Sequence, residues 1–366
     1  MPWTHLGASQ VPLIPLLTRR VNDVKLGIIS DLRNPEDPRY HRPWVQHYSQ
    51  FVELMVQLEN LGFESVVFPE HHFEANGYIP NPIPMMTAVA MKTKKMLVGT
   101  DLFRLPDWHP VRLAEDVAMV DILSNGRVIF KAGAGGVYPP ISAGLGWNSR
   151  SYLSRSAGTM QIIKKCWTEE EFDWDGRHYH LKGVRVIPKP VQKPHPPIYM
   201  PAMNAKAMEC NAREGYGCNM AAGRWSLERE DLGWWKTWYK DWEQALARHG
   251  RTKEECPVSM FVNLFCAKDP EQAWAKYKDG MLHVKHAYDR LLEQPLLPET
   301  PEELPHWDKA FLTPDDMVKL LRELLDGAVP DHLELWDNKP GMTYEDSYEF
   351  HKLFVEQVWP KIKDMA

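Results

Sequence analysis

Short runs of β-branched and aromatic residues alternate along the chain with longer segments whose apolar residues recur every three or four positions. Residues 24–30 (VKLGIIS) predict a buried strand, and residues 44–61 predict an amphipathic helix that stops at Gly62. We expect eight strands, at residues 24–30, 63–69, 96–103, 127–132, 197–201, 216–221, 257–266 and 331–336. We expect helices at residues 44–61, 84–94, 111–123, 154–167, 205–214, 229–249, 270–292, 313–325 and 344–363. Because strand–helix alternation builds a parallel sheet with crossover helices, this order predicts an α/β fold, a (β/α)₈ barrel.

Three segments interrupt the alternation. Residues 1–23 contain a proline-broken apolar stretch and are expected to form an arm, leaving residues 24–366 as a single barrel domain. The region around residues 137–190 reads as an insertion, because Asp175-Gly176 lies between two β-favouring segments and predicts a hairpin over residues 172–186. Residues 292–312, rich in proline and acidic residues, predict a second elaboration that is mostly loop.

The bulk composition narrows the function classes. The net charge of −6, with both signs mixed, argues against nucleic acid or an anionic membrane as the main partner. No apolar run approaches the length of a membrane span, and no basic residue precedes the short apolar stretch at the N-terminus, so neither a span nor a signal peptide is expected. Five cysteines without a CxxC pair favour a reduced, cytoplasmic setting.

The most informative chemistry lies at Glu70-His71-His72-Phe73, directly after the second expected strand. The carboxyl ends of the strands carry the catalytic groups in barrels of this kind. A carboxylate with two imidazoles at that place predicts proton handling near neutral pH, whereas an exposed polar turn is the alternative.

Several motifs, in order, resemble the bacterial luciferase-like family of flavin-dependent monooxygenases, including the luciferase α-subunit. They begin with the Glu-His-His-Phe segment and extend over roughly residues 24–362. The others are Asn81-Pro82, Val98-Gly99-Thr100, His109-Pro110-Val111-Arg112, Ala114-Glu115-Asp116-Val117, Gly126-Arg127, residues 167–179, Thr313-Pro314-Asp315 and Asp331-His332-Leu333.

The resemblance implies a two-component monooxygenase. Reduced FMN (FMNH₂), delivered by a separate NAD(P)H:flavin reductase, would react with O₂ to give a C4a-peroxyflavin that oxygenates a small organic substrate. By the same resemblance His71 is the catalytic histidine, and Glu70 would hydrogen-bond the flavin or fix its geometry. The resemblance also implies a non-proline cis peptide between Asp101 and Leu102, beneath the flavin ring, so Thr100, Asp101 and Leu102 are expected to contact the cofactor. Asp101 itself departs from the family, whose members usually have small apolar residues there.

The expected phosphate site also departs from the family pattern. The loop after the fifth strand reads Pro201-Ala202-Met203-Asn204-Ala205, so Asn204 replaces the hydroxyl residue of the family. Its amide can donate a hydrogen bond at the start of the next helix. In the loop after the fourth strand, Ala134 stands where luciferase has an arginine. We expect Ala202, Met203, Ala205 and Ala134 to lie near the cofactor.

The substrate pocket is the least determined part. We expect His72, Trp108, Trp147, Trp225 and Trp336 to contribute to it, and an aromatic wall of this kind suits an apolar substrate. His178 and His180 share a strand face, but no third ligand has a suitable spacing, so no metal site is expected. The helices at residues 44–61 and 84–94 are candidates for a homodimer contact.

Two other functions remain open at this point. An F420-dependent enzyme on the same barrel would transfer hydride without O₂. A non-catalytic flavin-binding protein would have an inert His71. Because no Gly-x-Gly-x-x-Gly follows an expected strand, no built-in NAD(P)H domain is expected.

Overall fold

A computed structural model describes residues 24–136, 138–221, 233–304, 308–337 and 339–363. The expected N-terminal arm therefore lies outside the described residues, as does the first part of the helix expected at 229–249. No helix in the described ranges combines the length and the apolar character needed to cross a bilayer.

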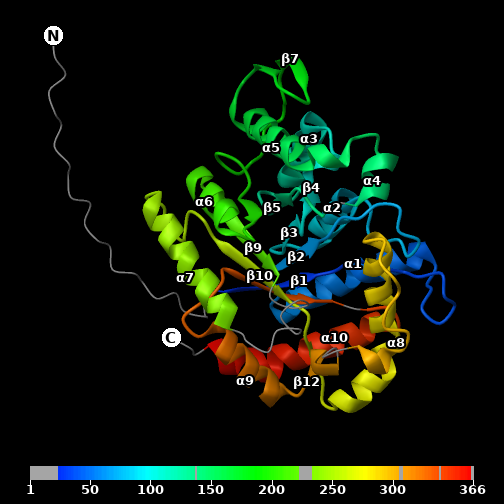
Figure 1. Ribbon diagram of the computed structural model, residues 1–366. Coiled ribbons are helices and arrows are strands. Elements are labelled where there is room, and N and C mark those ends of the chain that lie inside the picture. Colours follow the sequence, from blue (N-terminus) through cyan, green and yellow to red (C-terminus); the bar gives the residue numbers. More distant parts are fainter. Residues whose placement is uncertain (1–23, 137, 222–232, 305–307, 338, 364–366) are drawn as a thin grey trace, which may run out of the picture.

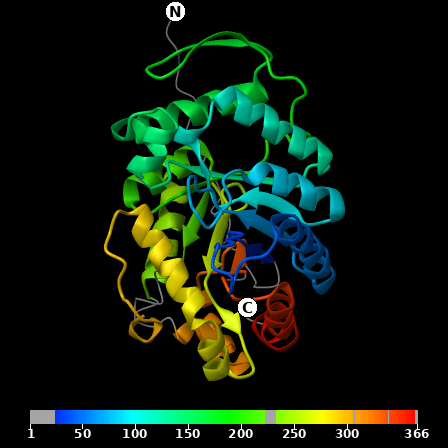
Figure 2. The same ribbon diagram turned by 90° about the vertical axis from the view of Figure 1, so that its right-hand side faces the viewer.

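Eight parallel strands close into a barrel, seen from two directions in Figures 1 and 2. The closure follows from two pairings: β3 bonds to β5, and β1 bonds to β13, so the first and last barrel strands are neighbours. The barrel strands are β1 (Lys25–Ile29), β2 (Ser65–Phe68), β3 (Leu97–Thr100), β5 (Val128–Gly133), β8 (Ile198–Pro201), β9 (Gly217–Ala221), β10 (Val258–Val262) and β13 (His332–Trp336). The predicted (β/α)₈ barrel is confirmed.

Helices surround the barrel on its outer side (Figure 1). α1 and α6 have the bounds predicted from the sequence, because the left-handed glycines Gly62 and Gly215 end them. Thr313 caps α9, accepting a hydrogen bond from the backbone N–H of Asp316 at 3.2 Å. The helices are α1 (Trp44–Leu61), α2 (Pro82–Lys92), α3 (Pro110–Leu123), α4 (Pro139–Gly144), α5 (Tyr152–Thr168), α6 (Ala205–Glu214), α7 (Gly233–Arg248), α8 (Pro270–Leu291), α9 (Pro314–Leu325), α10 (Tyr344–Leu353) and α11 (Trp359–Lys363).

Several elements differ from the sequence-based prediction. The strand expected at 96–103 breaks at Asp101-Leu102 into β3 and β4 (Phe103–Arg104), and the strand expected at 257–266 divides into β10 and β11 (Phe265–Cys266). β11 pairs with β12 (Phe311–Leu312), which replaces the end of an expected loop. The closing helix is divided by a π-helical turn at Phe354–Val358, and α4 was not predicted.

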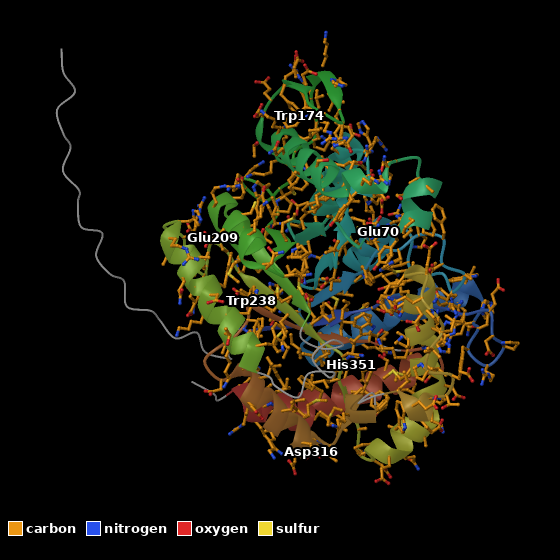
Figure 3. All side chains as sticks on the ribbon, in the orientation of Figure 1. Glu70, Trp174, Glu209, Trp238, Asp316 and His351 are labelled. Carbon is orange, nitrogen blue, oxygen red and sulfur yellow. The ribbon has the colours of Figure 1, made fainter. Side chains whose placement is uncertain are left out.

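The predicted hairpin is present as β6 (Phe172–Asp175) and β7 (His180–Val184), paired antiparallel. It lies at the edge of the molecule, at the top of Figure 1, where Trp174 is labelled in Figure 3. His180 bonds to Asp175 within the hairpin. The hairpin adds no strand to the barrel, although Phe172 at its start is buried in the large core cluster.

Side chains inside the barrel form an apolar layer and a polar layer. Successive strand residues face opposite sides, so in β13 Leu333 and Leu335 join the large core cluster under the helices. Trp336 instead packs in a cluster inside the barrel with Ile29, Val67, Ile129 and Tyr199. Next to this cluster lie Lys131 and Glu334, both with fully buried side chains. Charged residues in the barrel interior were not predicted.

Candidate functional site

A cavity of about 850 Å³ opens at the carboxyl ends of the barrel strands. This volume is typical of sites that hold a cofactor or a drug-sized ligand. Glu70 and His71 follow β2, Asp101 and Leu102 follow β3, and Trp336 ends β13, and all five line the cavity. The cavity therefore lies where barrels of this kind carry their chemistry.

His71 stands among three tyrosines at the cavity wall. Its ring stacks on Tyr78, with 4.3 Å between ring centroids, and lies 5.5 Å from the ring of Tyr138 and 6.1 Å from that of Tyr288. The hydroxyls of Tyr78 and Tyr288 are 3.0 Å apart. Burial raises the pKa of Tyr78 well above its usual range, so this phenol stays neutral. The three aromatic rings fix the orientation of an imidazole that faces the cavity.

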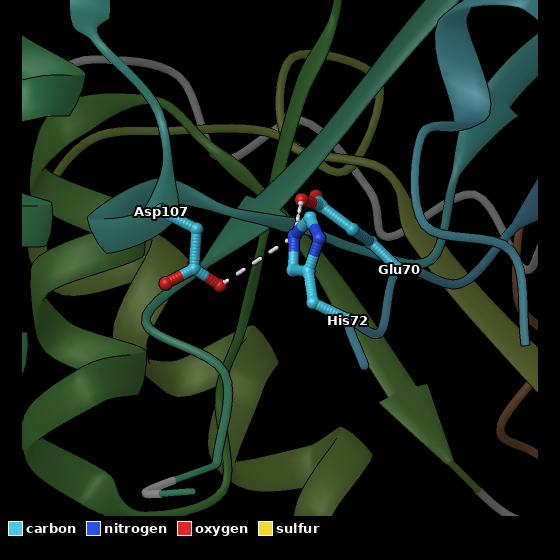
Figure 4. A group of neighbouring side chains, drawn as sticks. All are labelled: Glu70, His72 and Asp107. Carbon is cyan, nitrogen blue, oxygen red and sulfur yellow. Dashed lines mark hydrogen bonds and ion pairs between the residues drawn. The ribbon is translucent and has the colours of Figure 1, made fainter. Parts of the chain in front are cut away.

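Glu70 acts as a hydrogen-bond hub rather than projecting as a free carboxylate. It is 2% exposed. Its Oε2 accepts from the backbone N–H of Arg104 at 2.9 Å, and its Oε1 accepts from the indole N–H of Trp108 at 2.8 Å. The same Oε1 lies 2.8 Å from Nε2 of His72 (Figure 4). Glu70 therefore joins the loop after β2 to the end of β4 and to the segment that follows β4.

Glu70, His72 and Asp107 also lie close enough together to hold a metal ion, as Figure 4 shows. The hydrogen bonds donated to the two carboxylates argue for a structural role instead. Asp107 accepts from Nε of Arg104 at 2.6 Å, and Glu70 accepts from two N–H groups. N–H donors bond to both oxygens of Glu70 and to Oδ2 of Asp107, so we describe the group as a network that positions the loops.

The floor of the cavity contains the peptide bond between Asp101 and Leu102, which is cis as the resemblance implied. The side chain of Asp101 is 5% exposed and turns into the barrel. There its Oδ1 accepts from Nδ2 of Asn219 at 2.6 Å. Burial raises the pKa of Asp101. Leu102, Phe261 and Trp336 give the cavity a largely apolar base.

The start of α6 forms a polar end of the cavity. Asn204 caps this helix: its Oδ1 accepts from the backbone N–H of Ala207 at 3.0 Å. Asn204 itself is among the residues that line the cavity. Arg213 and Gln161 line the same cavity. These groups suit an anionic part of a ligand.

The remaining predicted site residues are divided between the cavity and its surroundings. Met203 and Ala134 line it. Thr100 does not: its hydroxyl bonds to the backbone carbonyl of Lys131 at 2.7 Å. Ala202 accepts from the indole of Trp238 behind the cavity wall. Neither His72, Trp108, Trp147 nor Ala205 is among the lining residues, and Trp225 lies outside the described residues.

Sequence reasoning missed the tyrosines around His71 and the charged pair inside the barrel. Tyr78, Tyr138 and Tyr288 lie on two loops and on α8, and nothing in the local pattern brings them together. Lys131 and Glu334 could have been identified from the sequence, since each is a charged residue inside a strand that is otherwise mostly apolar. A charge at such a position requires a buried partner.

The chain is similar to flavin- and deazaflavin-dependent enzymes over much of its length. It is 24% identical to the F420-dependent glucose-6-phosphate dehydrogenase of Microbacterium testaceum, over 86% of this chain and 94% of that protein. It is 29% identical to the oxygenase component of a flavin-dependent trigonelline monooxygenase from Acinetobacter baylyi, over 51% of each chain. The chain therefore spans about half the length of that second relative.

A solved structure with the same fold is the oxygenating constituent of 3,6-diketocamphane monooxygenase from Pseudomonas putida, a type II Baeyer–Villiger monooxygenase in complex with FMN. The TM-score is 0.72 at 18% identity, and the match covers 93% of this chain and 98% of that one. Beyond this likeness in fold, the model of the luciferase-like monooxygenase family matches residues 24–327. The cavity, the histidine at its wall and this match together establish that the chain belongs to the luciferase-like monooxygenase family.

Proposed function

We propose that this protein is the oxygenase component of a two-component monooxygenase that uses reduced FMN and O₂ to oxygenate a small, apolar organic substrate. The observation that carries the proposal is His71, held among three tyrosines at the wall of a cavity with an apolar base and a polar end. The flavin-dependent monooxygenases among its relatives support the choice of cofactor.

The residues present fit a flavin. Leu102, Phe261 and Trp336 offer apolar contacts for a flat ring system, and Asn204 and Arg213 offer donors for a phosphate. When bound, reduced FMN would supply the electrons that activate O₂. His71 would hold or move a proton at the cavity wall, because an imidazole titrates near working pH. Glu70 would keep His71 in place indirectly, by tying the two loops together.

A second candidate function rests on a specific observation. The match to the F420-dependent relative covers 94% of that protein, whereas the match to the flavin-dependent relative covers 51% of that protein. On this alternative the same cavity would take a reduced deazaflavin, and the reaction would be hydride transfer to or from an organic substrate. His71 would again serve as the proton-carrying group.

Cofactor binding under anaerobic conditions separates these functions. We expect photoreduced FMN to bind more tightly than reduced F420. After rapid mixing with oxygenated buffer, we expect bound FMNH₂ to reoxidise in a slow phase that free FMNH₂ lacks. His71→Asn should change the rate of that phase without abolishing binding, while His180→Asn on the peripheral hairpin serves as a matched control. Preferential F420 binding would favour hydride transfer. An unchanged His71→Asn variant would favour a non-catalytic flavin-binding role.

The proposal also includes a partner enzyme, a cellular location and an oligomeric state. A separate NAD(P)H:flavin reductase would supply FMNH₂, and the location would be the cytoplasm, consistent with five free cysteines. A homodimer would use the outer sides of α1 and α2, the two helices expected from the sequence to form this contact, where Val45 is 86% exposed and Met91 is 60% exposed. Sedimentation of Met91→Glu against the parent tests this contact, and an unchanged dimer would place it elsewhere.

A further inference from the structure

Three charged side chains meet inside the barrel, below the base of the cavity. Nζ of Lys131 bonds to Oε1 of Glu334 and lies 2.5 Å from the hydroxyl oxygen of Ser259. The same ammonium group is 3.8 Å from Oδ2 of Asp101. The exposed fractions of these charged side chains are 0% for Lys131, 0% for Glu334 and 5% for Asp101.

In the part of the chain that the structure describes, the other side chains that hydrogen-bond to this cluster are neutral. Asn219 of β9 and Ser259 of β10 are neutral and hydrogen-bond to it. Tyr199 of β8 presents its ring 5.9 Å from Nζ of Lys131, and its hydroxyl lies 3.2 Å from Nε2 of His332. His332 is thus another titratable group on this interior face, and Tyr199 lies between it and the cluster.

The charge count of the cluster does not balance. Two carboxylates and one ammonium leave one net negative charge in a buried place, where an uncompensated charge is strongly disfavoured. Burial accordingly raises the pKa of Asp101 and raises that of Glu334 to about 7. The two carboxyls interact through Lys131, so they titrate as one unit rather than independently.

The cluster is adjacent to the cavity. Asp101 itself belongs to the cavity base. Phe261 and Trp336, which also line the cavity, follow Ser259 and Glu334 by two residues on the same inward faces, a rise of roughly 7 Å along each strand. Because the three charged side chains are at most 5% exposed, a charge placed in the cavity is weakly screened and acts strongly on the cluster.

We propose that Asp101, Lys131 and Glu334 form a single buried acid, which takes up one proton when an anionic reduced cofactor occupies the cavity above it. The uptake brings the cluster from one net negative charge to neutrality, so the cofactor anion is not opposed by a second anion below it. The three side chains act as positioning residues, through charge and without contact with the reacting atoms. The inference rests on the proposed function, because it takes the ligand to be a reduced flavin or deazaflavin.

The first test uses the protein without cofactor. Infrared difference spectra across pH 6 to 9 should show one carboxylic acid that loses its proton near neutral pH. Both Asp101→Asn and Glu334→Gln should remove this signal, since either leaves one carboxylate opposite one ammonium. Exposed Glu171→Gln is the matched control. If no carboxylic acid titrates in this range, or if its signal survives both substitutions, the buried acid does not exist.

The second test measures proton uptake on binding, by anaerobic titration calorimetry with photoreduced FMN in buffers of different ionisation enthalpy. Oxidised FMN corrects for protons taken up by the phosphate. We expect an excess uptake approaching one proton per reduced FMN above neutral pH, and an affinity that weakens at most tenfold per pH unit there, because one proton is linked. Glu334→Gln and Asp101→Asn should each abolish both effects.

The outcomes separate this inference from the proposed function. If neither FMN nor F420 binds in either redox state, the proposed function fails, while the infrared result on the free protein still decides whether the buried acid exists. If reduced FMN binds and the excess uptake persists in both variants, the proton goes to the flavin or to His71, and the proposal is overturned. Circular dichroism and retained binding of oxidised FMN confirm that the variants are folded.

Discussion

Replacement of Glu70 by alanine should destabilise the whole barrel, and the structure gives the magnitude. The carboxylate accepts from the backbone N–H of Arg104 and the indole N–H of Trp108, while His72 completes the set. Both N–H donors lie in a part-buried or buried setting, and each buried donor left without an acceptor costs about 1–3 kcal/mol. His72 is 17% exposed and can reach water. We therefore expect Glu70→Ala to lower the free energy of unfolding by about 2–6 kcal/mol.

Urea unfolding followed by tryptophan fluorescence measures this change. With a slope of about 3 kcal/mol per molar urea, the midpoint should fall by roughly 0.7–2 M. Glu70→Gln keeps one acceptor oxygen and should cost less, about 1–2 kcal/mol. Glu171→Ala removes a half-exposed carboxylate paired with Arg185 and should change stability by no more than about 1 kcal/mol. A urea midpoint of Glu70→Ala equal to that of the parent would refute the claim that the hydrogen bonds to Glu70 stabilise the fold.

Two further predictions concern stability. Burial lowers the pKa of His47 to about 4, so below pH 6.5 the unfolded chain binds a proton that the folded chain does not. The free energy of unfolding should therefore fall by about 3 kcal/mol as the pH drops from 6.5 to 4. If this histidine is responsible, the urea midpoints measured at pH 7 and pH 5 should converge in His47→Gln. In α8, a Cβ on Gly280 would lie 1.8 Å from the carbonyl oxygen of Pro340, so Gly280→Ala should destabilise the protein by about 1–3 kcal/mol. In α5, a Cβ on Gly158 would meet only one atom of Tyr179, at 4.0 Å, so Gly158→Ala should be neutral or stabilise by up to about 1 kcal/mol. Equal thermal midpoints of the two variants would contradict this packing.

The parts of the fold that local signals determine were predictable. Helical periodicity predicts the extent of α1 and α6, and a left-handed glycine marks the C-terminal end of each. Asp175-Gly176 marks the hairpin. The break between β3 and β4 was not predicted as a strand end, because residues 96–103 were read as one strand in spite of Asp101 within them. The resemblance nevertheless placed the cis peptide at Asp101-Leu102 within that run.

The candidate site was predictable where it follows a strand directly. Glu70 and His71 are brought to the cavity by β2 alone, so their place could be read from the strand pattern. The partners of these residues come from elsewhere: Tyr288 lies on α8, more than two hundred residues later in the chain. Trp108 was expected to face substrate, but its indole bonds to Glu70, a contact that depends on how two loops meet. Only the tertiary fold determines such contacts.

The pairing of β1 with β13 has a consequence for how the protein is made. Lys25 lies opposite His332, so the barrel cannot close until about three hundred residues have left the ribosome. At roughly 5–20 residues per second, this takes about 15–60 s. During that interval the edges of β1 and its neighbours are without their final partner, and unpaired strand edges recruit other chains. Synthesis speed and chaperone access, as well as final stability, should therefore decide the yield of active protein in a cell.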